Sequence, residues 1–266
     1  KLLEKIKRDK IIVIKESAGI KEEVEYNIYN SLVYRMKRTD GKSEKIGMLM
    51  SGSWYYVNSD YYSELNERLE SKVVRSDSEL DKFSFIDFDK KIYKDELEYN
   101  KELARINNGV LLDEKYYYMK EDIAERKYNS RSNIEPCDLL LYSEEKKKYY
   151  FIHNKINSPN NTQGISHLST QANISTSLLL DIETSENFIK FINEKIKEQN
   201  CLSVPELKEI RNDNICVVLA IIDKDYDKSL KTNFTILKLQ ALDNSIARLE
   251  QLGVEVKIKL IKNKGN

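Results

Sequence analysis

The sequence has little of several residue types, and each shortage excludes a class of protein. Only three of its 266 residues are cysteine, and Cys137, Cys201 and Cys216 form no close pair, which argues against a disulfide scaffold or a cysteine-rich zinc site. No apolar run approaches the roughly 20 residues that cross a bilayer, and the charged start of the chain lacks the apolar stretch of a signal peptide. These features predict a cytoplasmic protein with no membrane partner.

Net charge is also lacking, because 44 Lys and Arg residues balance 44 Asp and Glu residues. This balance excludes a strongly basic surface on average but leaves room for a local basic groove. Glycine occurs eight times, and we find no Gly-rich phosphate loop, no nucleophile elbow and no zinc-finger spacing. The rest of the composition, 40% hydrophobic and 33% charged residues, is that of an ordinary domain with a core of its own.

The hydrophobic patterns predict a mixed α/β fold in two parts. Alternating apolar positions in IYNSLVYRM and KIGMLMSGSWYYV, followed by a helix, predict an N-terminal α+β subdomain over residues 1–89. Residues 90–266 show the order helix, strands with a hairpin, helix, strand, helix, strand. The fully apolar run ICVVLAIID is typical of a strand inside a sheet that is covered on both faces. We therefore expect a mixed sheet flanked by helices in the second part.

The hairpin in this second part gathers polar side chains. CDLLLY and KYYFIHNK flank the polar turn SEEKKK, and a turn centre between Glu145 and Lys146 sets Asp138 opposite His153. Directly opposed side chains lie on one face of the sheet, about 4.5–5.5 Å apart at Cβ, and Lys155 points to the same face. The register therefore predicts a carboxylate, an imidazole and an ammonium close together.

An Asp on one strand and an acid-x-Lys element on the next resemble the core of the PD-(D/E)xK nuclease superfamily, whose fold is restriction-endonuclease-like. In that chemistry, oxygen ligands hold a divalent cation, and the lysine orients the attacking water or stabilises developing charge. The preceding helix often adds a Glu, here Glu96, and the following helix a polar residue, here Gln171. One position departs from the pattern: His153 stands where an acid is usual, which favours Mn²⁺ over Mg²⁺ or puts catalysis in doubt.

Three longer segments carry a second resemblance. IEPCDLLLY, FIHNK and SHLSTQA look like signature blocks of a sporadically distributed bacterial family of unknown function that is often placed near phage-defence genes. SGSWYYVNSDY and the segment Glu96–Asn100 also resemble blocks of that family, although Asn154 and Ser169 depart from its usual residues. The resemblance implies a nuclease-like fold with His153 in place of the acid, and a chain that forms the C-terminal part of a longer member. On this match, Ser166, His167 and Gln171 open the helix after the hairpin.

Together these patterns lead to one functional hypothesis. We expect a divalent-metal-dependent nuclease that hydrolyses phosphodiester bonds of nucleic acid, DNA in the first place, in bacterial antiphage defence. Mg²⁺ or Mn²⁺ is the expected cofactor, and a second copy or a defence partner protein is a further expected contact. The expected metal ligands are Asp138, His153 and Glu96, and the expected catalytic residues are Asp138, His153, Lys155, Gln171 and His167.

Two other functional classes stay open. The first is a catalytically inactive nucleic-acid-binding module with a nuclease fold, because His153 breaks the acid pattern. The second is a protein-interaction or sensor domain whose polar cluster is structural, which the zero net charge supports. The candidate residues also have plainer interpretations: Asp138 as a cap or ion-pair partner, His153 as a core residue, and His167 as a helix-start residue.

Overall fold

A computed structural model describes residues 10–17, 20–27, 33–37, 44–50, 53–57, 59–75, 80–118, 133–157, 163–230 and 234–265. The contacts between residues divide the chain into two compact units, Lys1–Glu64 and Leu65–Asn266. Among the described residues, no helix combines the length and the apolar character needed to cross a membrane.

The first unit is built from two small antiparallel sheets. Strands β1 (Lys10–Ser17) and β2 (Ile20–Asn27) form a hairpin. Strands β3 (Val33–Lys37), β4 (Glu44–Met50) and β5 (Ser53–Val57) form a three-stranded meander. Strands β3, β4 and β5 confirm the prediction of strands in IYNSLVYRM and KIGMLMSGSWYYV for the described residues of these segments. Residues 28–32, the start of IYNSLVYRM, lie outside the described residues.

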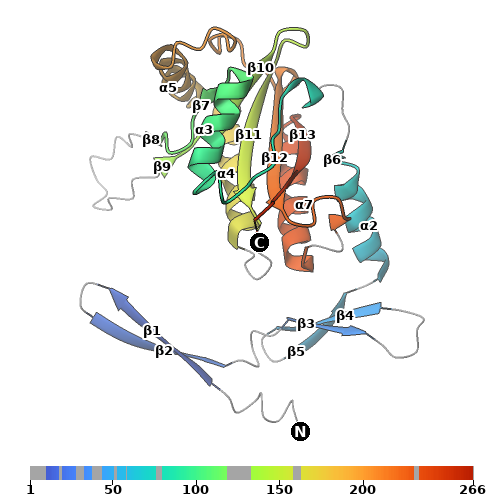
Figure 1. Ribbon diagram of the computed structural model, residues 1–266. Coiled ribbons are helices and arrows are strands. Elements are labelled where there is room, and N and C mark those ends of the chain that lie inside the picture. The colour runs from blue at the N-terminus through green and yellow to red at the C-terminus, as the bar shows by residue number, and fades with distance from the viewer. Residues whose placement is uncertain are drawn as a thin grey trace. The chain divides into compact units, whose positions relative to one another are not determined.

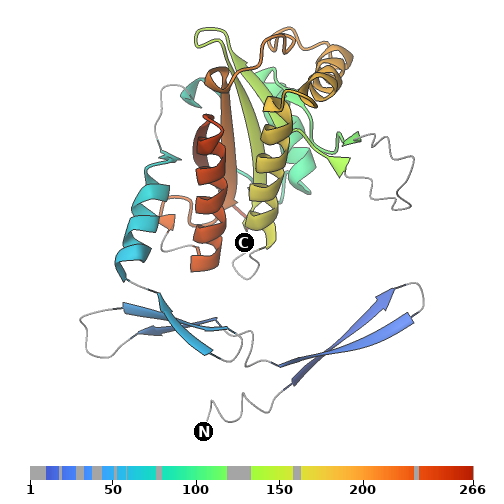
Figure 2. The same cartoon turned by 180° about the vertical axis from the view of Figure 1, so that it is seen from behind.

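A six-stranded mixed sheet organises the second unit, in the order β6-β13-β12-β11-β10-β7. Helix α3 (Glu96–Asn107) covers one face of this sheet, and helices α4 (Gln163–Leu180) and α7 (Ile236–Gln251) cover the other (Figures 1 and 2). The strands are β6 (Val73–Val74), β7 (Val110–Leu111), β10 (Leu139–Ser143), β11 (Lys148–Ile156), β12 (Ile215–Asp223) and β13 (Glu255–Lys262). The other elements are α2 (Ser59–Glu70), η2 (Leu80–Lys82), β8 (Tyr117–Tyr118), β9 (Asn133–Ile134), α5 (Ser185–Glu198) and η3 (Asn212–Asn214).

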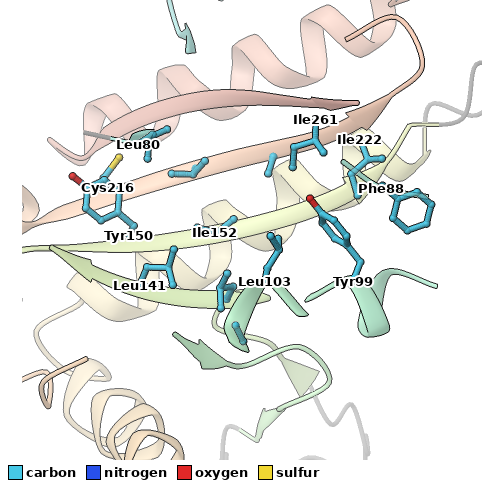
Figure 3. Packing of buried hydrophobic residues seen from close by; sticks show 14 residues of the cluster. Leu80, Phe88, Tyr99, Leu103, Leu141, Tyr150, Ile152, Cys216, Ile222 and Ile261 are labelled. Atoms are coloured by element: carbon cyan, nitrogen blue, oxygen red, sulfur yellow. The ribbon is translucent and has the colours of Figure 1, made fainter. Parts of the chain in front are cut away.

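The apolar core explains why β12 carries no polar residue before its end. All nine residues of β12 are buried, because the strand lies inside the sheet and helices cover both faces. On the α3 face, Tyr99 and Leu103 pack over Ile152 and its neighbours (Figure 3). Burying a Leu or Phe side chain stabilises a fold by about 1.5–3 kcal/mol, so this layer anchors α3 firmly to the sheet.

The β10–β11 hairpin has the predicted register. Leu139 pairs with Ile152 at one end, and Ser143 pairs with Lys148 at the turn. Strand β11 then runs parallel to β12, which runs parallel to β13. Regular pairing with β10 stops at Leu139, so the last residues of β11 extend past the start of β10. This step in the sheet leaves an edge at which loops from several elements meet.

The mixed α/β prediction and the predicted order of elements in the second part are confirmed. The limits of the parts differ from the sequence-based ones, because the contacts separate the units between Glu64 and Leu65 rather than after residue 89. Leu80 and Phe88, both within the predicted N-terminal subdomain, lie in the core cluster of the second unit. Strand β6 joins the six-stranded sheet by pairing with β13.

Candidate functional site

Three acidic side chains meet at the step between β10 and β11. Asp113 follows β7, Glu135 follows β9, and Asp138 directly precedes β10. Each offers a carboxylate oxygen, and these three oxygens all lie within 4.8 Å of one another. We call these three residues the acid cluster. Glu135 and Asp138 lie in the loop between β9 and β10, and Asp113 lies in the loop between β7 and β8. The fold of the sheet brings these two loops together.

Two buried asparagines hold the acid cluster against the sheet. The backbone N–H of Asn154 on β11 donates to Asp138 Oδ2 at 2.5 Å. The side-chain amide of Asn154 donates to Asn100 Oδ1 at 2.7 Å, and the amide of Asn100 donates to Asp113 Oδ2 at 2.8 Å. Asn100 lies on α3, so the helix and the strand fix two of the three carboxylates. The remaining polar atom of Asn154, Oδ1, is buried and has no partner among the described residues.

Negative charge is in excess at this site. Among the described residues, no lysine or arginine forms an ion pair with a member of the acid cluster. Burial raises the pKa of Asp138 well above its usual range, and the nearby charges of Asp113 and Glu135 raise it further, although the Asn154 N–H opposes the shift. Burial is also the main cause that raises the pKa of Glu135, to about 7, and that raises the pKa of Asp113. Such a group of acids must share protons or bind a cation.

An ion pair between Lys155 and Glu96 lies beside the acid cluster. The Lys155 ammonium donates to Glu96 Oε2 at 2.7 Å, and the backbone N–H of Ile156 donates to Glu96 Oε1 at 2.8 Å. Glu96 begins α3, so its carboxylate caps the free edge of β11 where β10 is no longer present. The two side chains are 29% and 26% exposed, which leaves the Lys155 ammonium within reach of a ligand.

Helix α4 contributes from the other side of the step. The Gln171 amide donates to the Glu135 carboxylate, which also accepts the backbone N–H of Glu114. His167 lies one turn earlier on α4 and is exposed. Both residues line a pocket of about 200 Å³ that also contains Glu135. A larger hollow of about 700 Å³ lies near the C-terminal ends of α3 and α5 and contains none of these residues.

His153 does not take part in these contacts. Its side chain is fully buried, and neither ring nitrogen has a hydrogen-bond partner among the described residues. Burial lowers the pKa of His153 to about 3, so the ring is neutral at ordinary pH. The expected contact with Asp138 does not form as a hydrogen bond, because pairing becomes irregular there: the Asp138 N–H donates to Ile152 O and its carboxylate accepts from Asn154.

Apart from His153, the structure places the sequence-based candidates in three groups. Asp138 belongs to the acid cluster, Lys155 and Glu96 form the adjacent ion pair, and Gln171 contacts Glu135 while His167 lines the pocket beside it. The sequence-based reasoning missed Asp113 and Glu135. It named Asn100 and Asn154 only within the family blocks and gave them no role as ligands or catalytic residues. Glu135 stands in the quoted block IEPCDLLLY, three residues before Asp138, whereas no pattern in the sequence singled out Asp113.

The chemistry of these groups fits a divalent cation. Carboxylate oxygens and an amide oxygen are hard ligands, which suit Mg²⁺, Mn²⁺ or Ca²⁺ rather than a soft metal. The buried, unpartnered Asn154 Oδ1 adds an uncharged oxygen on a residue that contacts Asp138 directly. Asp113, Glu135 and Asp138 would hold the ion, and their charges would be offset by it.

Comparison with known proteins identifies the family of the chain. Residues 1–262 match the model of a family of unknown function, DUF6119, and the chain belongs to this family. No curated protein and no solved structure matches it.

Proposed function

For this member of a family of unknown function, we propose a metal-dependent nuclease that hydrolyses phosphodiester bonds of nucleic acid, DNA in the first place, and that serves bacterial antiphage defence. The observation that carries the proposal is the acid cluster, a partly buried excess of negative charge next to a lysine that Glu96 holds in an ion pair. The defence role rests on the resemblance of the signature blocks alone.

The arrangement of elements supports this proposal. Helix α3 precedes the antiparallel strands β7, β10 and β11, and α4 then leads to β12, which is parallel to β11. This order resembles the PD-(D/E)xK core. Asp138 stands at the start of the second of these strands and Lys155 near the end of the third, as the motif requires.

The acid cluster also supplies carboxylates that are missing from the motif because His153 stands at its acid position. Its ring is buried, neutral and without a hydrogen-bond partner among the described residues, which leaves it unsuited to replace the missing acid. Asp113, from the loop after β7, and Glu135, from the loop that also holds Asp138, supply two further carboxylates. An oxygen ligand set for Mg²⁺ or Mn²⁺ is thereby retained without His153.

The other residues take roles that follow from their contacts. A divalent cation, when bound, would polarise the phosphate and lower the pKa of a water. Glu96 holds the Lys155 ammonium beside the cluster, where it can stabilise negative charge on the phosphate or orient the attacking water. Gln171 orients the Glu135 carboxylate, and the Asn154 N–H orients that of Asp138.

A nucleic-acid-binding or sensor module without catalysis is the second candidate. The observation that favours it is the burial of His153. This residue stands where the motif has an acid, and its buried ring offers no ligand atom to an ion that enters from solvent. In this case the acid cluster would bind a cation that only anchors a phosphate.

A cleavage assay with matched variants decides between the two candidates. We expect the protein to cut DNA or RNA oligonucleotides with Mn²⁺ or Mg²⁺ but not with EDTA. Asp138→Asn and Lys155→Ala should each lower the rate at least about 100-fold without unfolding the protein. Asp213→Asn is the control, since that acid is exposed on η3. Full activity in both site variants would contradict the assignment, and salt-dependent binding without cleavage would establish the second candidate.

A further inference from the structure

The pocket beside the acid cluster is formed by a two-stranded ribbon and α4. Strands β8 and β9 pair antiparallel through Tyr117 and Ile134. The pocket measures about 200 Å³, and its lining combines aromatic, aliphatic and amide side chains: Tyr116, Asn133, Ile134, Glu135, His167, Thr170, Gln171 and Ile174. Because Glu135 belongs to both, the pocket opens next to the place where a cation would bind.

Packing of the ribbon against α5 holds the pocket in shape. The Tyr117 ring contacts Phe188 and Phe191 on α5, with ring centroids 5.2 Å and 5.7 Å apart. Tyr116 directly precedes β8 in the chain. Tyr116 lines the pocket, whereas Tyr118 does not. The ribbon therefore presents one tyrosine to the pocket on a backbone that α5 fixes.

The lining suits a flat, uncharged heteroaromatic group. Tyr116 is 40% exposed and Ile174 is 43% exposed, so an aromatic and an aliphatic surface are open to a ligand. The amides of Asn133 and Gln171 and the imidazole of His167 supply donors and acceptors around them. Stacking on an aromatic ring with hydrogen bonds to the base edge is how proteins bind an unpaired nucleobase. The Glu135 carboxylate disfavours a phosphate inside the pocket itself.

We propose that this pocket receives one unpaired base of the strand whose phosphate lies at the acid cluster, so that the substrate is single-stranded nucleic acid. This inference rests on the proposed function for the position of the phosphate. A base inside a duplex cannot enter the pocket, because it would have to leave its stack and its partner first. Base capture next to the cation would also fix which phosphate faces Lys155.

Binding and cleavage of matched oligonucleotides test the inference. Fluorescence anisotropy with Mn²⁺ should show tighter binding of a single-stranded oligonucleotide than of the duplex of the same sequence. Tyr116→Ala should weaken single-strand binding at least about fivefold, because it removes one stacking surface. Tyr116→Phe keeps the ring and should bind as the wild type does. Tyr118→Ala is the matched control, since this tyrosine is 53% exposed but lies outside the pocket.

The outcomes separate this inference from the proposed function. Selective weakening by Tyr116→Ala supports base capture even when nothing is cleaved. Equal binding by Tyr116→Ala and Tyr118→Ala overturns base capture, as does a wild type that binds no single strand with or without Mn²⁺. Metal-dependent cleavage of duplex alone would leave the nuclease proposal standing and overturn the pocket assignment. Mn²⁺ binding by calorimetry, unchanged in Tyr116→Ala, would show that the variant still holds the metal.

Discussion

Two polar clusters near the end of β11 differ in how their charges are balanced. The acid cluster brings three carboxylates together, and no lysine or arginine among the described residues pairs with them. The second, which we call the lysine cluster, consists of Asn157, Asp223 and Lys238. There the Lys238 ammonium donates to Asn157 Oδ1 at 2.8 Å, and the Asn157 amide donates to the Asp223 carboxylate.

The difference lies in what each carboxylate meets. Asp223 and Lys238 are 7% and 1% exposed, and their opposite charges stand on either side of one amide. Burial lowers the pKa of Lys238, while the Asp223 charge acts against this shift. In the acid cluster, burial and like charges both raise the pKa of Asp138. A balanced cluster can stabilise a fold by itself, whereas an unbalanced one needs protons or a cation from outside.

The largest expected effect comes from unbalancing the lysine cluster. Lys238→Met removes the buried ammonium that faces Asp223 across the Asn157 amide, and we expect the free energy of unfolding to fall by about 3–5 kcal/mol in urea denaturation. Adding Asp223→Asn to the variant should recover part of this loss. Lys264→Met is the control, because the Lys264 side chain is 49% exposed, and its effect should stay within about 0.5 kcal/mol. If Lys238→Met left the free energy of unfolding unchanged, the balance of charge in the lysine cluster would not contribute to stability.

An intermediate effect should follow from balancing the acid cluster. Mn²⁺ at 100 times its dissociation constant should stabilise the wild type by about 2.7 kcal/mol, because the ion binds the folded state alone. Thermal melting with Mn²⁺ and with EDTA measures the difference. Asp138→Asn should lose this stabilisation and Asp213→Asn should keep it. Identical melting temperatures of the wild type in Mn²⁺ and in EDTA would rule out a cation at this cluster.

The third expected effect is a pH dependence of the metal-free protein. Glu135 has a raised pKa, about 7 in the folded chain against 4.5 ordinarily, so the folded state holds this proton more tightly than the unfolded state. Its contribution to stability is present below pH 4.5 and is lost as the pH rises through about 7. One such group contributes a slope of at most about 1.4 kcal/mol per pH unit. Urea denaturation in EDTA at a series of pH values should show that the wild type loses stability relative to Glu135→Gln between pH 4.5 and about 7. The same dependence of unfolding free energy on pH in both proteins would contradict this prediction.

Local patterns were sufficient to predict the framework of the second unit. The centre of the turn SEEKKK between the apolar runs CDLLLY and KYYFIHNK set the hairpin register, and the structure has that register from Leu139 to Ser143. The apolar run of β12 indicated a strand covered on both faces, which the burial of all its residues confirms. These predictions succeed because strand period and turn position are properties of contiguous residues.

The composition of the acid cluster could not be predicted in the same way. Asp113 and Glu135 lie in loops, beyond strands of two residues that are too short to show a period. The predicted register also implied a contact between Asp138 and His153 that does not form as a hydrogen bond. The regular ladder ends at the Leu139–Ile152 pair, and the Asp138 carboxylate accepts a hydrogen bond from the Asn154 N–H instead. Where a ladder ends, side-chain direction depends on hydrogen bonds that sequence spacing does not encode.

The four-residue turn between β10 and β11 has a practical consequence for protein engineering. Residues 144–147 join the strands at the end of the hairpin far from Asp138, and Lys147 already adopts a left-handed conformation with φ 51°. A fluorophore or affinity tag inserted between Glu145 and Lys146 would lengthen the loop and leave every strand pair in place, at the cost of the surface ion pair between Lys82 and Glu145. A label at that turn would follow the protein through binding experiments without touching the site under study.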